Sequence, residues 1–341
     1  MNEQLTRLAL ILLLAVSIPA AAGQLARAVV HGKSLEGNLS GDSPDREVSV
    51  YLPPGYEKSR ERYPVLYLLH GFTDSDANWF GLNGKHFVNV PKAVDAAVAR
   101  GTKPMIVVMP NAFTKFQGSM YSSSVVIGDW ERFVTQELVA YVDTHYRTLA
   151  RPGSRGLAGH SMGGFGALRL ALEDPGIFSS VYSMSPCCLD ANPKPSIEWL
   201  QNAAKVRSDA DIAAADFITK AMLASAAAWS PDPRNPPLYL ELPLRDGQLR
   251  PEILTRWAAN SPLVTVHQRI PALKSYRAVA IDAGDKDTGI AANVREFHEV
   301  LESYGITHAY EIYDGDHVNR IEQRLTDKVM PFFSEQLEFS K

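Results

Sequence analysis

Long apolar runs separated by turns dominate the first third of the chain. Residues 63–71 (YPVLYLLHG) and 103–111 (KPMIVVMPN) are almost continuously apolar and contain many β-branched and aromatic side chains. Such runs are typical of strands that are buried on both faces of a parallel sheet. Residues 46–56 (REVSVYLPPGY) alternate between polar and apolar side chains and then meet two prolines, which predicts a strand followed by a turn. Between the two buried runs, residues 90–101 (VPKAVDAAVARG) have a helical spacing that stops at a glycine.

The alternation of strand and helix continues along the chain. Residues 128–147 place apolar side chains every three or four positions behind Asp129, a suitable N-cap, and this pattern predicts a long helix. Further strands are expected at residues 154–160, 179–186, 276–284 and 307–315, with helices at 162–174, 292–305 and the end of the chain. Strands that alternate with helices predict an α/β fold with a mostly parallel central sheet and helices on both faces.

One segment interrupts this alternation. Residues 189–262 contain an alanine-rich helical stretch (209–229) and then a proline-dense stretch (230–247), without a further obvious core strand. We interpret the segment as a helical and proline-rich cap insertion that lies over one edge of the sheet.

The N-terminus has the organisation of an export signal. A short polar start is followed by the eleven-residue apolar run Leu8–Ile18, and Ala20 and Ala22 fit the small-residue rule for signal-peptidase cleavage. As a helix, this run would span about 16 Å, too little to cross a hydrocarbon core of about 30 Å. We therefore expect residues 1–22 to be a signal peptide and residues 23–341 to be exported, either periplasmic or secreted. An uncleaved anchor or a buried helix is the alternative.

Charge and cysteine content exclude several classes of protein. The formal net charge is −4 and no dense cluster of Lys or Arg is present, which argues against nucleic acid or an anionic membrane as a partner. The only two cysteines, Cys187 and Cys188, are neighbours, so the chain is no disulfide scaffold, and without spaced histidines they make no zinc site. Two small buried thiols are expected, with a strained vicinal disulfide as the alternative.

One glycine-rich stretch carries a candidate nucleophile. Residues 159–163 (GHSMG) match the G-x-S-x-G pattern and fall between a predicted strand and a predicted helix, as a nucleophile elbow requires. Small residues allow the sharp turn that lifts the hydroxyl of Ser161 clear of the sheet, and the helix start offers N–H groups for an oxyanion. A glycine-rich turn that merely contains a serine is the alternative interpretation.

A serine nucleophile needs a base and an orienting carboxylate, which in α/β-hydrolases follow it in the order acid, then histidine. Of the histidines after Ser161, only His317 falls on a loop just after a predicted strand. The loop after the preceding strand offers Asp282, Asp285 and Asp287. Spacing alone does not choose among these three, although the last two are slightly favoured because the chain has left the sheet there.

The turn after residues 64–69 suggests a second oxyanion donor. In α/β-hydrolases the loop after the third strand supplies a backbone N–H to the oxyanion, which points here to Phe72 alongside Met162. His70 and His160 neighbour these positions and are expected to have a structural role. No metal or organic cofactor is expected.

Five motifs together resemble the esterase D-like branch of the α/β-hydrolases: VYLPPGY, YPVLYLLHG, GDWERFVTQELVAYVDTHYRT, GLAGHSMGGFGALRLAL and DGDH. That branch includes S-formylglutathione hydrolases, feruloyl, acetyl-xylan and enterochelin esterases, and mycolyltransferases. The resemblance covers residues from about 29 to 190 and from about 276 to the end. It implies that residues 23–341 form one α/β-hydrolase catalytic domain that carries the cap insertion.

The same resemblance implies Ser161 as the nucleophile and His317 as the base. The acid motif of the hydrolase members, I-D-x-G-x-x-D, is matched by residues 281–287, so the acid is carried over to Asp287. The chain departs from feruloyl esterases after His317, where Val318 stands in place of the aromatic residues that often follow. The proline-rich insertion matches no substrate-defining pattern.

These features predict a serine carboxylic-ester hydrolase that works through an acyl-enzyme on small, aryl or short-acyl esters. The alternatives are an exported acyltransferase that passes an acyl group to a carbohydrate hydroxyl, and an inactive hydrolase fold used for binding. Trp229 and Trp257 are expected either to line the substrate pocket or to form the core of the insertion. The resemblance also places Tyr121 and Trp130 near the site. A small-molecule ester is the expected partner, and a homo-oligomer is compatible with the sequence.

Overall fold

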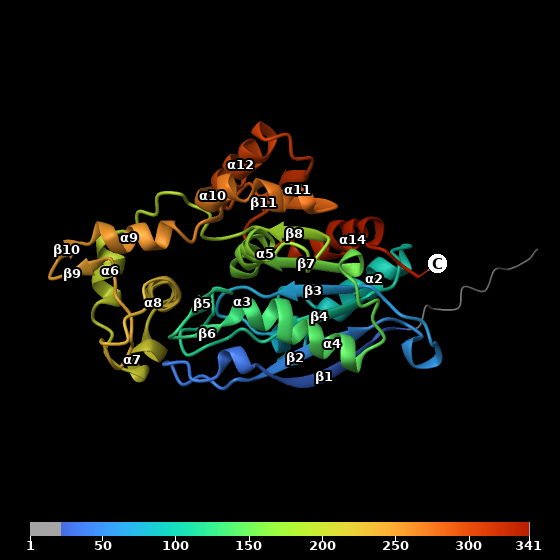
Figure 1. Ribbon diagram of the computed structural model, residues 1–341, viewed down its shortest axis with the longest axis horizontal. Coiled ribbons are helices and arrows are strands. Elements are labelled where there is room, and N and C mark those ends of the chain that lie inside the picture. The colour runs from blue at the N-terminus through green and yellow to red at the C-terminus, as the bar shows by residue number, and fades with distance from the viewer. Residues whose placement is uncertain (1–21, 341) are drawn as a thin grey trace, which may run out of the picture.

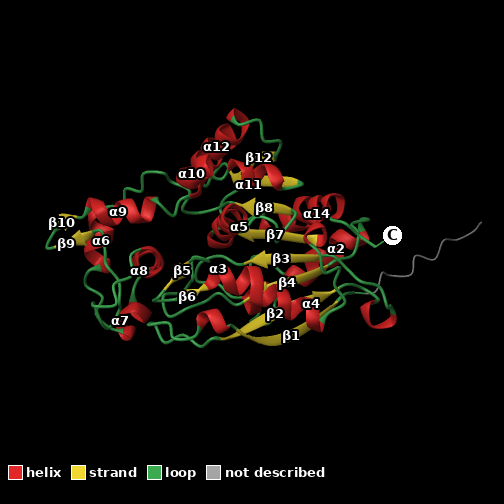
Figure 2. Ribbon diagram, viewed as in Figure 1, coloured by secondary structure: helices red, strands yellow, loops and turns green. Residues whose placement is uncertain are grey.

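An eight-stranded sheet runs through the protein, for which a computed structural model describes residues 22–340 (Figures 1 and 2). Its strand order is β1 (Gln24–His31), β2 (Asp45–Leu52), β4 (Ile106–Pro110), β3 (Val65–Leu69), β7 (Arg155–His160), β8 (Ser180–Met184), β11 (Ala278–Gly284) and β12 (Ala309–Tyr313). β2 is antiparallel to both of its neighbours, whereas the strands from β4 to β12 are parallel. The predicted mostly parallel α/β sheet is confirmed. Residues 1–21 of the expected signal peptide lie outside the described residues.

Helices cover both faces of the sheet, and β3 shows how its side chains are divided between them. Leu66 and Leu68 belong to one buried cluster, while Val65, Tyr67 and Leu69 belong to the other, as the alternation of a strand requires. The first face is covered by α1 (Asp76–Trp79), α2 (Val90–Ala99), α13 (Ile321–Arg324) and α14 (Met330–Gln336). The second face is covered by α3 (Trp130–Arg132), α4 (Leu138–His145), α5 (Met162–Glu173) and α12 (Thr288–Ser303).

Local sequence signals set the ends of two predicted helices. The carboxylate of Asp129 accepts the N–H of Arg132 at 3.0 Å and caps α3, which continues into α4 through a π-helical turn at Phe133–Glu137. In α2, the side chain of Asn89 caps the N-terminus, and the chain leaves the helix before Gly101, whose φ of 99° suits glycine. Both helices lie where their apolar spacing predicts them.

Strand β1 was not predicted from the sequence. It pairs along its whole length with β2, from Gln24 opposite Leu52 to His31 opposite Asp45. As the edge strand it leaves most of its side chains partly or fully exposed, and Val29 is 61% exposed. Its apolar pattern is therefore too weak to distinguish it from a loop. Its pairing with β2 is what makes this segment a strand.

Between β8 and β11 the chain adds no strand to the main sheet. It forms α6 (Ile197–Ala203), α7 (Asp209–Ala214), α8 (Phe217–Trp229), a hairpin of β9 (Leu244–Arg245) and β10 (Gln248–Leu249), α9 (Pro251–Ala258), α10 (Pro262–Thr265) and α11 (Ile270–Ser275). Figure 2 shows α6 to α9 and the hairpin at the end of the molecule toward which the parallel strands point. A further short hairpin, β5 (Ser123–Ser124) and β6 (Gly128–Asp129), lies beside α8. The segment predicted as an insertion thus lies beyond the carboxyl ends of the strands, where α/β folds bind ligands.

One ion pair is buried against the sheet. Asp282 on β11 has no exposed surface and accepts hydrogen bonds from Arg324 at 2.5 Å and from the hydroxyl of Tyr182 at 2.8 Å. Arg324 also donates to Glu311 at 2.8 Å. Burial raises the pKa of Asp282 above its usual value, although Arg324 opposes this shift. The guanidinium is thus the main compensation for a charge placed inside the protein.

Replacing Arg324 with methionine should destabilise the fold by about 3–5 kcal/mol, because the carboxylate of Asp282 is left buried without its counter-charge. Without the guanidinium, the pKa of Asp282 in the folded protein rises further above its value in the unfolded chain. The folded variant then binds a proton more readily, so its deficit in unfolding free energy should narrow as the pH falls below neutrality. Urea unfolding at several pH values measures this.

The control is Arg277→Met, which breaks an exposed pair with Glu338 and should cost no more than about 1 kcal/mol. Equal stability losses in the two variants would contradict the role assigned to the buried pair.

Candidate active site

The turn at Ser161 joins β7 to α5 and has a strained backbone. Ser161 has φ 58° and ψ −117°, a combination that side-chain-bearing residues rarely adopt. The flanking glycines are required by close packing. A Cβ on Gly159 would lie 2.1 Å from the carbonyl oxygen of Gly163, and one on Gly163 would lie 2.0 Å from that of Leu69. The helix therefore approaches β7 and β3 closely, and this approach forces the sharp turn that carries the serine.

His317 and Asp287 lie within hydrogen-bonding distance of this turn. His317 Nε2 is 2.9 Å from Ser161 Oγ, and His317 Nδ1 is 2.5 Å from Asp287 Oδ2. His317 lies on the loop after β12, and Asp287 lies between β11 and α12. The carboxyl ends of β7, β11 and β12 thus bring a hydroxyl, a carboxylate and an imidazole into one line. In this arrangement the imidazole can accept the hydroxyl proton through Nε2 while Nδ1–H donates to the carboxylate.

The two other candidate acids lie elsewhere. Asp282 is bound to Arg324 inside the protein, as described above. Asp285 accepts the N–H of Gly315 at 3.0 Å, and its own N–H donates to the carbonyl of Tyr313 at 2.8 Å. Asp285 therefore ties the loop after β11 to the loop that carries His317. Of the three carboxylates that spacing left open, only Asp287 reaches the imidazole.

The turn after β3 lies beside the serine. A Cβ on Gly71 would be 3.5 Å from the Cβ of Ser161. His70 Nδ1–H donates to the carbonyl of Gly71 at 2.8 Å, and His70 Nε2 accepts the N–H of Ala112 at 2.8 Å. Burial lowers the pKa of His70, which favours this neutral form. Since the carbonyl of Gly71 and the N–H of Phe72 belong to one planar peptide, His70 fixes the direction of that N–H.

The N–H groups of Phe72 and Met162 are both available at this turn. Met162 opens α5, so its N–H has no partner within the helix. Within residues 22–340, the N–H of Phe72 has no hydrogen-bond acceptor in the protein either. These are the two donors that the sequence predicts for an oxyanion.

His160 contacts His317, the candidate base, through a hydrogen bond and through ring packing. Its Nε2–H donates to the carbonyl oxygen of His317 at 2.8 Å, and the centroids of the two rings are 4.7 Å apart. The rings of Trp79 and Phe87 pack near His160 on its other sides. Burial, together with the nearby charge of His317, lowers the pKa of His160 to about 3, so the ring stays neutral at ordinary pH. A structural role was expected for His160, but no sequence signal indicated its bond to the histidine loop.

The four candidate lining residues divide into two pairs. Tyr121 and Trp130 are fully buried, and their polar atoms donate to the carbonyls of His70 and Ile127. Both side chains form part of the core, and neither presents an accessible surface to a substrate. Trp229 and Trp257 instead line a cavity of about 330 Å³ at the inner side of the insertion.

The remaining walls of this cavity are also mostly apolar, and they comprise Cys188, Asp190, Pro193, Lys194, Pro195, Trp199, Met222, Ser225 and Ser261. We call it the aromatic cavity. It borders the elbow through the Cys187–Cys188 segment, since the N–H of Cys187 donates to the carbonyl of Ser161 at 3.2 Å. The ring of Trp229 also packs on Phe165 of α5, with a centroid separation of 5.5 Å.

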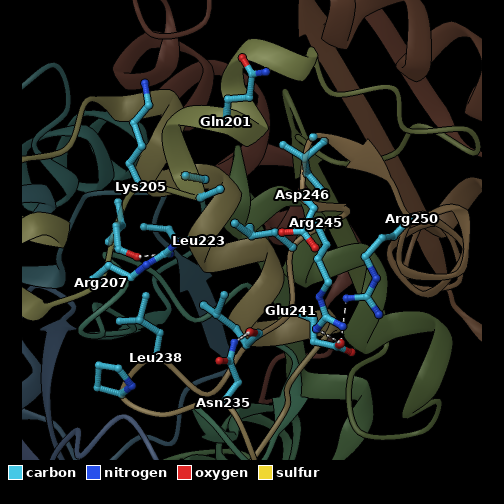
Figure 3. A pocket seen from close by; sticks show the side chains of 18 of the residues that line it. Gln201, Lys205, Arg207, Leu223, Asn235, Leu238, Glu241, Arg245, Asp246 and Arg250 are labelled. Carbon is cyan, nitrogen blue, oxygen red and sulfur yellow. Dashed lines mark hydrogen bonds and ion pairs between the residues drawn. The ribbon is translucent and has the colours of Figure 1, made fainter.

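A larger cavity of about 710 Å³ lies within the insertion (Figure 3), and neither it nor the aromatic cavity is lined by Ser161, Asp287 or His317. Three of the six charged side chains that line the larger cavity are paired with one another. Glu241 accepts hydrogen bonds from Arg250 at 2.8 Å and from Arg245 at 3.4 Å, as the dashed lines in Figure 3 show. Only the aromatic cavity is lined by Cys188, whose neighbour Cys187 is hydrogen-bonded to Ser161, so it is the better candidate for a substrate pocket although it is smaller.

Two structural features are absent from residues 22–340. No helix in this range has the length and apolarity needed to span a bilayer. Within the same range, no group of three or more His, Cys, Asp or Glu side chains is placed to hold a metal ion.

A strained serine turn, with a histidine and an acid at the ends of neighbouring parallel strands, defines the class: the fold is that of an α/β-hydrolase. The chain belongs to the putative esterase family, whose model matches residues 43–325. This match confirms the family resemblance of the sequence motifs.

Two relatives show how far the similarity extends. An esterase of Mycobacterium tuberculosis is 31% identical over 210 residues, which make up 55% of this chain and 44% of that protein. An endo-1,4-beta-xylanase/feruloyl esterase of Xylanibacter ruminicola is 36% identical over 138 residues, or 38% of this chain and 18% of that protein. The matches therefore span less than half of the length of these relatives.

Solved structures show the same fold. A ferulic acid esterase matches with a TM-score of 0.65 and 23% identity, over 93% of this chain and 100% of its own. An S-formylglutathione hydrolase of Staphylococcus aureus matches with a TM-score of 0.59 and 15% identity, again over 93% of this chain and 100% of its own. At these identities the likeness establishes the fold.

Removing the hydrogen bond from His160 should impair the position of His317. We expect His160→Phe, which keeps an aromatic ring, to lower kcat on an aryl ester about 10- to 100-fold with little change in KM, because the base shifts relative to the serine. His160→Gln can still donate to the carbonyl of His317 and should recover part of this loss. Steady-state kinetics measure both effects.

Because His160 stays neutral, the acid limb of the pH–rate profile should keep its position in His160→Gln. A His160→Phe variant with unchanged kcat would show that the hydrogen bond does not position the base.

Proposed function

We propose that the chain is a serine carboxylic-ester hydrolase that forms an acyl-enzyme on Ser161. The observation that carries this proposal is the continuous line from Ser161 Oγ to His317 Nε2 and from His317 Nδ1 to Asp287 Oδ2. Neither relatives nor solved structures assign these roles residue by residue, so they rest on the geometry. Membership of the putative esterase family supports the reaction class.

In the first half of the reaction, Ser161 Oγ attacks the carbonyl carbon of the ester as His317 Nε2 accepts its proton. The carboxylate of Asp287 keeps the imidazole in the required tautomer and stabilises the imidazolium. The negative charge that develops on the carbonyl oxygen is met by the N–H groups of Phe72 and Met162, each worth about 3 kcal/mol in such a site. His317 then returns the proton to the departing alkoxide, which leaves the acyl group on Ser161.

In the second half, water replaces the alcohol. His317 accepts a proton from this water as it attacks the acyl carbon, and the same two N–H groups stabilise the second tetrahedral intermediate. Collapse of that intermediate releases the carboxylic acid and restores the hydroxyl of Ser161. In this collapse His317 returns its proton to Ser161 Oγ, so every proton moves between Ser161, His317, the substrate and water.

The acyl group that we propose is small or aromatic. The aromatic cavity has a volume of about 330 Å³, and the indoles of Trp229 and Trp257 form one of its walls. Flat aromatic surfaces favour an aromatic acyl group through offset or edge-to-face contacts. The feruloyl esterase activity that the name of the Xylanibacter relative includes agrees with this preference.

The acid assignment can be tested with a matched pair of variants. Asp287→Asn should lower kcat about 10⁴-fold, because the amide stabilises the wrong imidazole tautomer. Asp285→Asn should retain near wild-type kcat, since an amide oxygen can still accept the N–H of Gly315. Ser161→Ala should lose both turnover and covalent labelling by a fluorophosphonate probe. Substantial turnover by Ser161→Ala, or equal losses in the two aspartate variants, would refute the assignment.

The acyl preference can be tested with aryl esters that vary in the acyl group from acetyl to cinnamoyl and feruloyl. Replacing Trp229 with alanine should lower kcat/KM for the aromatic acyl esters at least about tenfold, because an apolar wall is lost, and should affect the acetyl ester less. Leu238→Ala, in the larger cavity, is the control and should leave the preference unchanged. Parallel losses on all esters in Trp229→Ala would remove the aromatic cavity as the acyl site.

The same assay with a carbohydrate acceptor separates hydrolysis from acyl transfer. The proposal requires the free acid as the main product, whereas a predominant acyl-sugar would assign the chain to the acyltransferases.

A further inference from the structure

The two cysteines lie together at the wall of the aromatic cavity. Neighbouring side chains on an extended strand point in opposite directions, which would separate the two sulfurs. Here Cys188 has φ 60°, a left-handed conformation that side-chain-bearing residues rarely adopt, and the thiol of Cys188 contacts Cys187 Sγ at 2.8 Å. The backbone is thus held in a strained conformation that brings both thiols to the same side of the chain.

This strain is concentrated next to the nucleophile. Ser185, three residues earlier, also has a positive φ, 40°, and its N–H donates to the carbonyl of Asp282 at 2.8 Å. The N–H of Cys187 donates to the carbonyl of Ser161. Strained residues persist where the surrounding structure holds them, and they cluster at functional sites. The proposed esterase mechanism uses neither thiol, so it does not account for this pair.

The two thiols differ in their surroundings. Cys188 lines the aromatic cavity, where a small molecule can reach its sulfur. The hydrogen bond from Cys188, and then burial, raise the pKa of the Cys187 thiol well above its usual value. A reagent in the aromatic cavity therefore meets Cys188 first, and the sulfur of Cys187 lies beside the mixed disulfide that forms there.

We propose that Cys187 and Cys188 form a dithiol modification site that a small-molecule disulfide oxidises to a vicinal disulfide, and that this oxidation reshapes the aromatic cavity. The effect on catalysis rests on the proposed esterase function, whereas the thiol chemistry does not.

The reaction balances in two exchange steps. The thiolate of Cys188 attacks one sulfur of the small disulfide, forming a mixed disulfide and releasing one small thiol. The thiolate of Cys187 then attacks the sulfur of Cys188, forming the Cys187–Cys188 bond and releasing the second small thiol. Two protons and two electrons pass from the protein to the small disulfide. Because neighbouring Cα atoms are only about 3.8 Å apart, the new bond is strained and should be readily reduced again.

Oxidation of Cys187 and Cys188 should change two neighbouring features, the aromatic cavity and the turn at Ser161. Closing the ring between the two sulfurs alters the backbone at Cys188, which moves its side chain within the cavity. It also disturbs the hydrogen bond from the N–H of Cys187 to Ser161. Aromatic acyl groups that fill the cavity should therefore be affected more strongly than an acetyl group.

The test uses the whole protein incubated with oxidised glutathione and then with dithiothreitol. Mass spectrometry of the unreduced protein should show the loss of two hydrogens without a glutathione adduct. Phenylarsine oxide, which bridges paired thiols, should bind the reduced protein with one-to-one stoichiometry. Oxidation should lower kcat/KM for a feruloyl aryl ester about tenfold, a change typical of a reshaped apolar pocket, and dithiothreitol should restore it. Cys187→Ser/Cys188→Ser should neither bind the arsenical nor respond to oxidised glutathione.

Two results would overturn the proposal: separate glutathione adducts on the cysteines, or an internal disulfide that leaves the hydrolysis of the feruloyl ester unchanged. The wild-type protein answers both questions by itself, so the result does not depend on folding of the double variant. If the reduced protein hydrolyses no ester, the esterase function fails, while mass and arsenical binding still decide whether the dithiol exists.

Discussion

The position of the candidate nucleophile depends on how closely α5 packs against β7 and β3. Gly159 and Gly163 leave no room for a side chain at this crossing, and Ser161 is held between them at φ 58°. A conformation of this kind costs of order 1–3 kcal/mol and persists only where its surroundings determine it. Here the contact of α5 with β7 and β3 holds Ser161 in this conformation. The position of Ser161 is therefore a consequence of core packing and does not depend on a mobile loop.

The same constraint explains why the other groups of the site come from distant parts of the sequence. Once Ser161 is fixed at the end of β7, its partners must come from the carboxyl ends of other parallel strands, which meet at the same edge of the sheet. β11 and β12 satisfy this requirement in register, and Asp285 links the loops that follow them. His160, the residue before the serine, then holds the backbone of His317. The serine turn thus also positions the loop of the candidate base.

The sequence predicted the elements that have strong local signals and missed those that tertiary contacts decide. The buried run of β3 and the capped helix at Asp129 follow from periodicity, and Ser161 and His317 follow from motif and chain order. Three nearby aspartates could not be separated by spacing, because their roles depend on which way each side chain leaves the chain. The family resemblance places Trp130 near the site, but the packing of its helix buries the indole in the core.

The insertion is attached to the catalytic core beside the aromatic cavity. Trp229 donates to Ser122 at 3.1 Å, and Ser124 donates to the carbonyl of Ala227 at 2.6 Å. Ser261 donates to the carbonyl of Leu189 and so joins the two ends of the insertion. These bonds span long sequence separations and involve buried or half-buried groups. A pocket wall held in this way is preorganised, so its shape can discriminate among acyl groups without a closing motion. A covalent change at Cys188 would therefore act on a cavity wall that these hydrogen bonds hold in place.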